Sequence, residues 1–134
     1  HASARPSMGG GAVVTEDGDT PGRAYHFRRS WIRHRLRASP SHLRIMHVEG
    51  DSMVPTLQDG DAVLVDMTRQ LPNPPGIFVL DDGIGLVAKR LEHIPNSDPS
   101  AVRVISDNKH YSEYERTADE IRIIGRIRWF AREI

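Results

Sequence analysis

The residues of this chain best suited to chemistry are a serine in a tight turn and a lysine in a short apolar segment. Ser52 stands in the segment 50–57 (GDSMVPTL), where glycine and proline flank it. Such a turn can expose the hydroxyl and direct backbone N–H groups inward, and a serine nucleophile needs both features. Because a serine hydroxyl is a weak nucleophile, a nearby base must accept its proton.

Lys89 is the candidate base. It lies in the segment 86–91 (LVAKRL), and in a strand Val87, Lys89 and Leu91 would share one face. Apolar neighbours disfavour the charged ammonium, so we expect the pKa of Lys89 to be lowered toward the range of a general base. The chain's other lysine, Lys109, lies in a polar loop.

Composition excludes several other chemistries. The chain has no cysteine, so disulfides, zinc–thiolate sites and a cysteine nucleophile are ruled out. Its seven histidines show neither triad nor metal-binding spacing, and we expect no metal and no cofactor. Eighteen basic residues balance eighteen acidic ones, which gives no overall reason to expect nucleic-acid binding. The apolar runs are far shorter than the roughly 20 residues that span a bilayer, so we expect a cytoplasmic protein without membrane contact.

The order of segments predicts an arm followed by one domain. Residues 1–22 are rich in small and turn-forming types and are interpreted as a flexible arm, and residues 23–134 as the folded domain. Residues 27–37 carry apolar side chains at helical spacing and predict a short amphipathic helix. Its arginines are interpreted as a solvated helix face rather than as phosphate contacts.

The rest of the chain alternates short apolar segments with glycine, proline and aspartate clusters, which is typical of a mostly β domain, barrel-like or sandwich. The turn at 81–83 (DDG) predicts a hairpin. The predicted strands are 43–48, 62–66, 77–80, 86–91, 102–105 and 121–130.

The segment 50–57, together with 88–90 (AKR), resembles the LexA-like self-cleaving domains. This group includes LexA, UmuD and lambda-type phage repressors (peptidase family S24). The resemblance extends to 59–61 (DGD), to 106–108 (SDN) with a tyrosine close behind, and to 124–129 (IGRIRW). It implies a β-barrel or sandwich like those of LexA and signal peptidase.

The resemblance also implies roles for particular residues. Ser52 would be the nucleophile and Lys89 the general base, and the backbone N–H groups of Asp51 and Ser52 would form the oxyanion hole. Members of the family cut their own amino-terminal arm, usually between Ala and Gly. This chain has no Ala-Gly dipeptide, and the nearest candidate bond is Met8-Gly9, where glycine permits a tight bend.

The partners implied by the resemblance are a second copy of the chain and a RecA–DNA filament. The homodimer would form along the last strand, and the filament would stimulate cleavage during DNA damage. Contact with operator DNA would belong to an amino-terminal domain that this chain does not contain.

Three other functions remain open. The chain could be a non-catalytic dimerisation module of a phage-type regulator, or an UmuD-like polymerase accessory subunit. A type I signal peptidase shares a similar serine box and lysine base. The absence of a membrane anchor and of long insertions argues against that third function.

Overall fold

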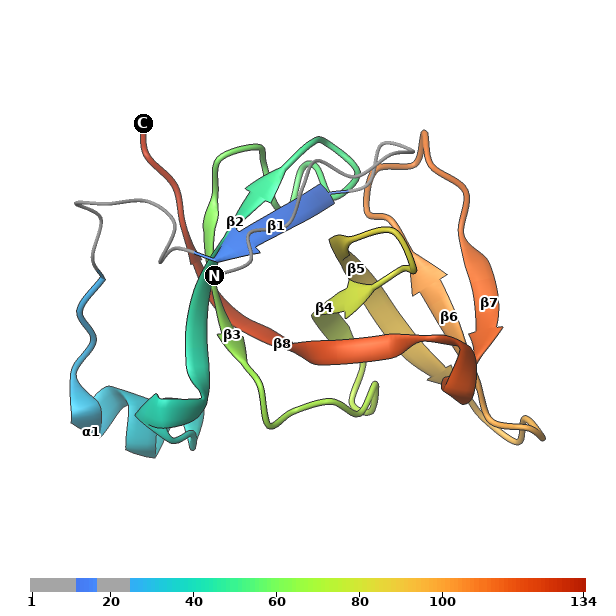
Figure 1. Ribbon diagram of the computed structural model, residues 1–134, viewed down its shortest axis with the longest axis horizontal. Helices are drawn as coiled ribbons and strands as arrows, with labels where there is room; N and C mark the ends of the chain where they lie inside the picture. The colour runs from blue at the N-terminus through green and yellow to red at the C-terminus, as the bar shows by residue number, and fades with distance from the viewer. Residues whose placement is uncertain (1–11, 17–24) are drawn as a thin grey trace.

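The computed structural model describes the backbone of residues 12–16 and the whole of residues 25–134 (Figure 1). Its helical segments are short: α1 (Arg29–Trp31), the π-helix η3 (Ile32–Leu36), and the 3-10 helices η4 (Pro40–His42) and η5 (Ala118–Glu120). The strands are β1 (Ala12–Glu16), β2 (Leu43–Glu49), β3 (Ala62–Asp66), β4 (Gly76–Asp81), β5 (Leu86–Ile94), β6 (Ala101–Ile105), β7 (Tyr114–Thr117) and β8 (Arg122–Ala131).

The strands form one antiparallel sheet in the order β1-β2-β3-β8-β4-β5-β6-β7. β1 pairs a second time, with β5, so the sheet curls until these two strands meet. β8 is the long element that links the two parts of the sheet, because its first half pairs with β4 and its second half with β3. Figure 1 shows this red strand crossing the molecule from one part to the other.

The mostly β fold predicted from sequence is confirmed. Each of the six predicted strands is present with bounds within three residues of the prediction, and β4 and β5 form the predicted hairpin. Two strands were not predicted. β1 lies inside the segment interpreted as a flexible arm, and β7 is a four-residue strand of sequence YERT.

The predicted amphipathic helix is shorter and more irregular than a regular α-helix over 27–37. One turn, α1, continues directly into η3, which buries Ile32 and Leu36 against the sheet. Arg37 ends the segment in the left-handed region with a φ of 52°. Among the described residues, no helix has the length and apolar character needed to cross a bilayer.

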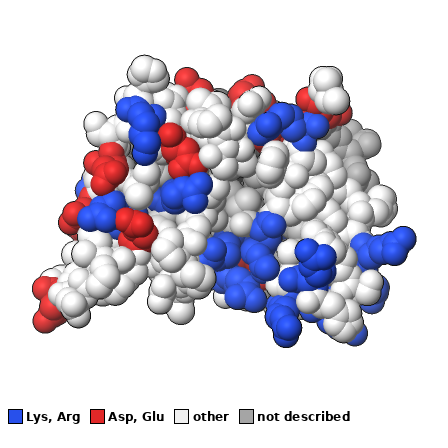
Figure 2. Space-filling model, turned by 180° about the vertical axis from the view of Figure 1, so that it is seen from behind, with Lys and Arg blue, Asp and Glu red and all other residues white. Residues whose placement is uncertain are grey.

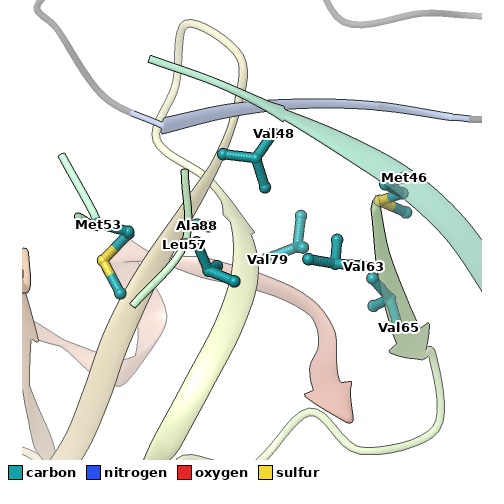
Figure 3. Close-up of a cluster of buried hydrophobic side chains, with 8 residues drawn as sticks. All are labelled: Met46, Val48, Met53, Leu57, Val63, Val65, Val79 and Ala88. Carbon is teal, nitrogen blue, oxygen red and sulfur yellow. The ribbon is translucent and has the colours of Figure 1, made fainter. Parts of the chain in front are cut away.

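The core consists of two clusters of buried side chains, and β5 contributes to both. Its successive residues point to opposite faces, so Ala88 packs in one cluster while Val87 and Leu91 pack in the other. The first cluster also contains Met53 and Leu57 from the turn after β2 (Figure 3). This packing anchors the serine-containing turn against β5, the strand that carries the candidate lysine.

Candidate serine–lysine site

Ser52 lies in the turn that follows β2. Met53 and Leu57, which follow Ser52 in this turn, are buried in the core and anchor the turn, and the Leu57 N–H donates to the Met53 carbonyl at 2.9 Å. The Val54 N–H donates to the Asp51 carbonyl at 3.2 Å. Ser52 is 0% exposed, so the turn does not expose its side chain to solvent.

Lys89 is also buried, with 8% of its surface exposed. It follows the alternation of β5, in the same row as the buried Val87 and Leu91, and it stands opposite Phe78 of β4 in the strand register. Its Nζ donates a 2.7 Å hydrogen bond to the Oγ of Ser106. Burial lowers the pKa of Lys89, and the negative charge of Asp82 partly opposes this shift.

One loop connects the lysine to the serine turn. Ser106, which begins it, binds the Lys89 amine, and the Asn108 N–H two residues later donates to the Ser52 carbonyl at 3.0 Å. The Asn108 side chain donates to the Asp51 carbonyl at 3.0 Å, and the Tyr111 hydroxyl lies 2.5 Å from the Asp51 carboxylate. The Lys89 Nζ lies 5.9 Å from the centre of the Tyr111 ring. The loop thus contacts both candidate groups.

Asp107, in the middle of this loop, accepts hydrogen bonds from both sequence segments. Its carboxylate accepts two hydrogen bonds of 2.8 Å from the Arg90 guanidinium, and one of 2.5 Å from the Thr56 hydroxyl. The Arg90 hydrogen bonds are the main cause that lowers the pKa of Asp107. Its backbone N–H meets the sulfur of Met53 at 3.4 Å. The segments 50–57 and 88–90 therefore share one carboxylate partner.

Sequence reasoning did not identify Ser106 or Asp107 as members of the site. The segment 106–108 was noted only because it resembles a family loop. Lys89 and Ser106 are neighbours because of the strand register. Arg90 of β5 pairs with Ile105 of β6, and Lys89 and Ser106 are the next residues along these antiparallel strands. Such a pairing cannot be read from the local sequence of either strand.

The predicted cleavage bond, Met8-Gly9, lies outside the described residues. The segment that follows it in the predicted arm is β1, and β1 pairs with β5 in the register Ala12–Ala88 and Val13–Val87. The backbone of this segment therefore runs beside the neighbour of Lys89.

The described part of the chain contains no group of three or more His, Asp or Glu side chains placed to hold a metal ion. The polar groups that converge at the site are instead a hydroxyl, an amine and their hydrogen-bond partners.

Comparison with known proteins agrees with this architecture. The model of the Peptidase S24-like family matches residues 3–128. The 26 kDa repressor protein of Escherichia phage HK022 is 27% identical over 125 residues, which cover 90% of this chain and 52% of that protein. The chain thus spans about half the length of this curated relative. Because the family pattern extends over nearly the entire chain, this protein belongs to the Peptidase S24-like family.

Proposed function

We propose that this chain is the carboxy-terminal domain of a LexA-like or phage-type repressor and that it cuts its own arm with Ser52 and Lys89. The observation that carries the proposal is the buried Lys89 amine, joined through the loop 106–111 to the turn that contains Ser52. Burial lowers the pKa of this amine, which favours the neutral form that a general base requires.

In the proposed mechanism, neutral Lys89 takes the proton of the Ser52 hydroxyl while the oxygen attacks the carbonyl carbon of Met8. The backbone N–H groups of Asp51 and Ser52 stabilise the oxyanion. The Lys89 ammonium then protonates the departing nitrogen of Gly9, which leaves an ester between Ser52 and Met8. Water hydrolyses the ester and regenerates the free hydroxyl.

The pairing of β1 with β5 supports an intramolecular reaction. Gly9 precedes Ala12 by three positions, and three residues reach at most about 10 Å. Since Ala12 pairs with Ala88, the covalent chain tethers the candidate bond to a residue that is paired with β5, the strand that carries Lys89. Tethering raises the effective concentration of the bond, so even a weak nucleophile could cut it.

Intact-mass spectrometry over time in mildly basic buffer tests the proposal. The wild-type chain should give fragments 1–8 and 9–134, and Ser52→Ala and Lys89→Met should give none while melting as cooperatively as wild type. Met8→Ala should cut at least as fast as wild type, because a smaller residue fits the usual Ala-Gly pattern. If the folded wild-type chain yields no fragment, the protein is instead a non-catalytic dimerisation module.

We also propose that the chain forms a homodimer along β8. Residues 127–131 pair with β3, and among the described residues no strand pairs with them on the other side. Phe130 in this stretch is 46% exposed, and an open strand edge with an exposed aromatic residue favours self-association. Sedimentation analysis should give a dimer that Phe130→Asp dissociates, and a wild-type monomer at all concentrations would contradict this.

The remaining roles would depend on the whole protein. A RecA–DNA filament would stimulate the cleavage, and operator DNA would be bound by an amino-terminal domain, so that cleavage would separate DNA binding from dimerisation. An UmuD-like accessory subunit would use the same cleavage chemistry without a DNA-binding domain.

A further inference from the structure

Five arginines that are far apart in sequence line one surface pocket. They come from η3 and its end, from the loop after β3, and from β8, and they surround a volume of about 220 Å³ together with Leu36 and Pro74. The five are Arg35, Arg37, Arg69, Arg126 and Arg128. Figure 2 shows Lys and Arg side chains gathered on one part of the back of the molecule, although the chain as a whole has no net charge.

The positive charge of this arginine pocket is poorly compensated. The pocket lining contains no carboxylate. The buried carboxylate of Asp66 pairs with two of the five arginines. Its Oδ2 lies 3.4 Å from Arg69 and 3.8 Å from Arg128. Arg35 and Arg37 form no ion pair with any residue that the structure describes.

Two of the arginines are held in place by backbone and ring contacts. Arg128 donates a 2.8 Å hydrogen bond to the Leu36 carbonyl. Arg126 donates to the Pro74 carbonyl, and its guanidinium lies 4.6 Å from the centre of the Phe78 ring. Burial lowers the pKa of both arginines, and repulsion from neighbouring arginines lowers it further. The pocket therefore presents a preorganised cluster of cations that an anion would stabilise.

A second pocket extends this surface. It shares Arg69, Pro74 and Arg126 with the arginine pocket and adds the exposed amide of Asn73. The combined lining is polar and cationic, with few apolar side chains.

We propose that the arginine pocket binds phosphate groups of a nucleic-acid backbone, without reading the bases. Guanidinium groups match phosphate in a bidentate geometry, and double-stranded DNA presents one negative charge per roughly 1.7 Å of its axis. An acidic protein partner fits less well, because protein–protein interfaces are more apolar and less positively charged than protein–DNA interfaces. This role is independent of Ser52 and Lys89. It replaces the solvated-face interpretation for Arg35 and Arg37.

The test is fluorescence anisotropy with a labelled 20-base-pair duplex of arbitrary sequence, titrated with the 134-residue chain between 50 and 200 mM salt. The variant is Arg35→Gln combined with Arg37→Asn, since asparagine tolerates the positive φ at position 37. The matched control is Arg33→Gln combined with Arg122→Gln, which removes the same charge from exposed positions outside the pocket.

We expect salt-sensitive wild-type binding. The slope of log K against log salt is negative. The pocket variant should reduce its magnitude by about 1 to 2, and the control should leave it unchanged. Arg69 lies in another part of the pocket lining, so Arg69→Gln repeats the test if the double variant is less stable than wild type. It should reduce the magnitude of the slope by about 1. Absence of binding at about 100 μM protein, the weak end of non-specific affinity, would overturn the proposal. So would an equal loss in the control, or tighter binding of a polyglutamate peptide than of the duplex.

Discussion

The Nζ of Lys89 donates a 2.7 Å hydrogen bond to the Oγ of Ser106, and both side chains are nearly buried, at 8% and 3% exposure. The two residues lie at neighbouring positions on the paired strands β5 and β6. A lysine side chain with four methylene groups samples many rotamers, and this hydrogen bond selects one direction for the amine. Since the same loop binds the backbone of Ser52 through Asn108, Ser106 positions the amine relative to the serine turn.

Replacing Ser106 with alanine should slow cleavage by up to about 100-fold without abolishing it, because the amine loses its positioning partner but keeps its burial. Ser106→Thr keeps a hydroxyl and should restore most of the rate. The measurement is the single-turnover rate on the high-pH plateau, where the lysine is fully neutral. Ser112→Ala is the control, since Ser112 is exposed in the same connection. Equal rates for wild type and Ser106→Ala would remove the positioning role.

The rate of self-cleavage should rise with pH and reach half its maximum below pH 10.5, the ordinary pKa of lysine. Burial lowers the pKa of Lys89, so the neutral base forms at lower pH than it would in water. The unfolded chain then binds more protons than the folded chain between the folded pKa and 10.5. The stability of the fold should therefore rise with pH across that window. Lys89→Met should lack this rise in urea unfolding, and a rate profile independent of pH would contradict the assignment.

Asp82→Asn should make cleavage faster near neutral pH. The negative charge of Asp82 raises the pKa of Lys89, so its removal lowers that pKa and increases the neutral fraction. Asparagine keeps an oxygen for the hydrogen bonds that the side chain accepts from the backbone N–H groups of Ile84 and Gly85. The gain should shrink in high salt, which screens this charge. A slower reaction with an intact fold would show that Asp82 acts in another way.

Asp107→Asn should lower the free energy of unfolding by about 1–2 kcal/mol, because it weakens the hydrogen bonds from Arg90 and Thr56. The pKa of Asp107 is lowered in the fold, so its contribution is present above the ordinary value of 3.8 and is lost as pH falls through the folded pKa. Urea unfolding should thus show the difference at pH 7 but not in strong acid. Glu92→Gln, in the more exposed pair with Arg103, is the control and should lower the free energy of unfolding less than Asp107→Asn does.

Gly125→Ala should destabilise the fold by about 1–3 kcal/mol. A methyl group there would lie 2.5 Å from the Asp66 carbonyl oxygen and 2.8 Å from a Val65 methyl, and the backbone cannot move aside easily. Gly76→Ala is the comparison, because the added methyl would meet the guanidinium of the Arg126 side chain rather than backbone atoms. Thermal unfolding should show the larger loss for Gly125→Ala, and an unchanged melting temperature would mean that β3 and β8 separate at little cost.

Local sequence determined most of the strands. The segment that became β3 (AVLVD) and the first three residues of β5 (LVA) are rich in valine and leucine and follow turn residues, and such segments favour strands. β1 and β7 carry only weak signals of their own, AVVTE and YERT. Their strand conformation depends on partners, since β1 lies between β2 and β5, and β7 pairs with β6.

The sequence by itself also indicated the two candidate groups for the proposed chemistry, because a serine in a glycine–proline turn and a lysine in an apolar strand are local patterns. The tertiary structure decided what surrounds them. Ser106 binds Lys89, and Arg35 and Arg126 line the same pocket, only because strand register and packing bring distant residues together. Alternation along one segment fixes which face a side chain occupies. The partner on that face is fixed by the pairing of separate segments, which depends on the free energy of the whole folded chain.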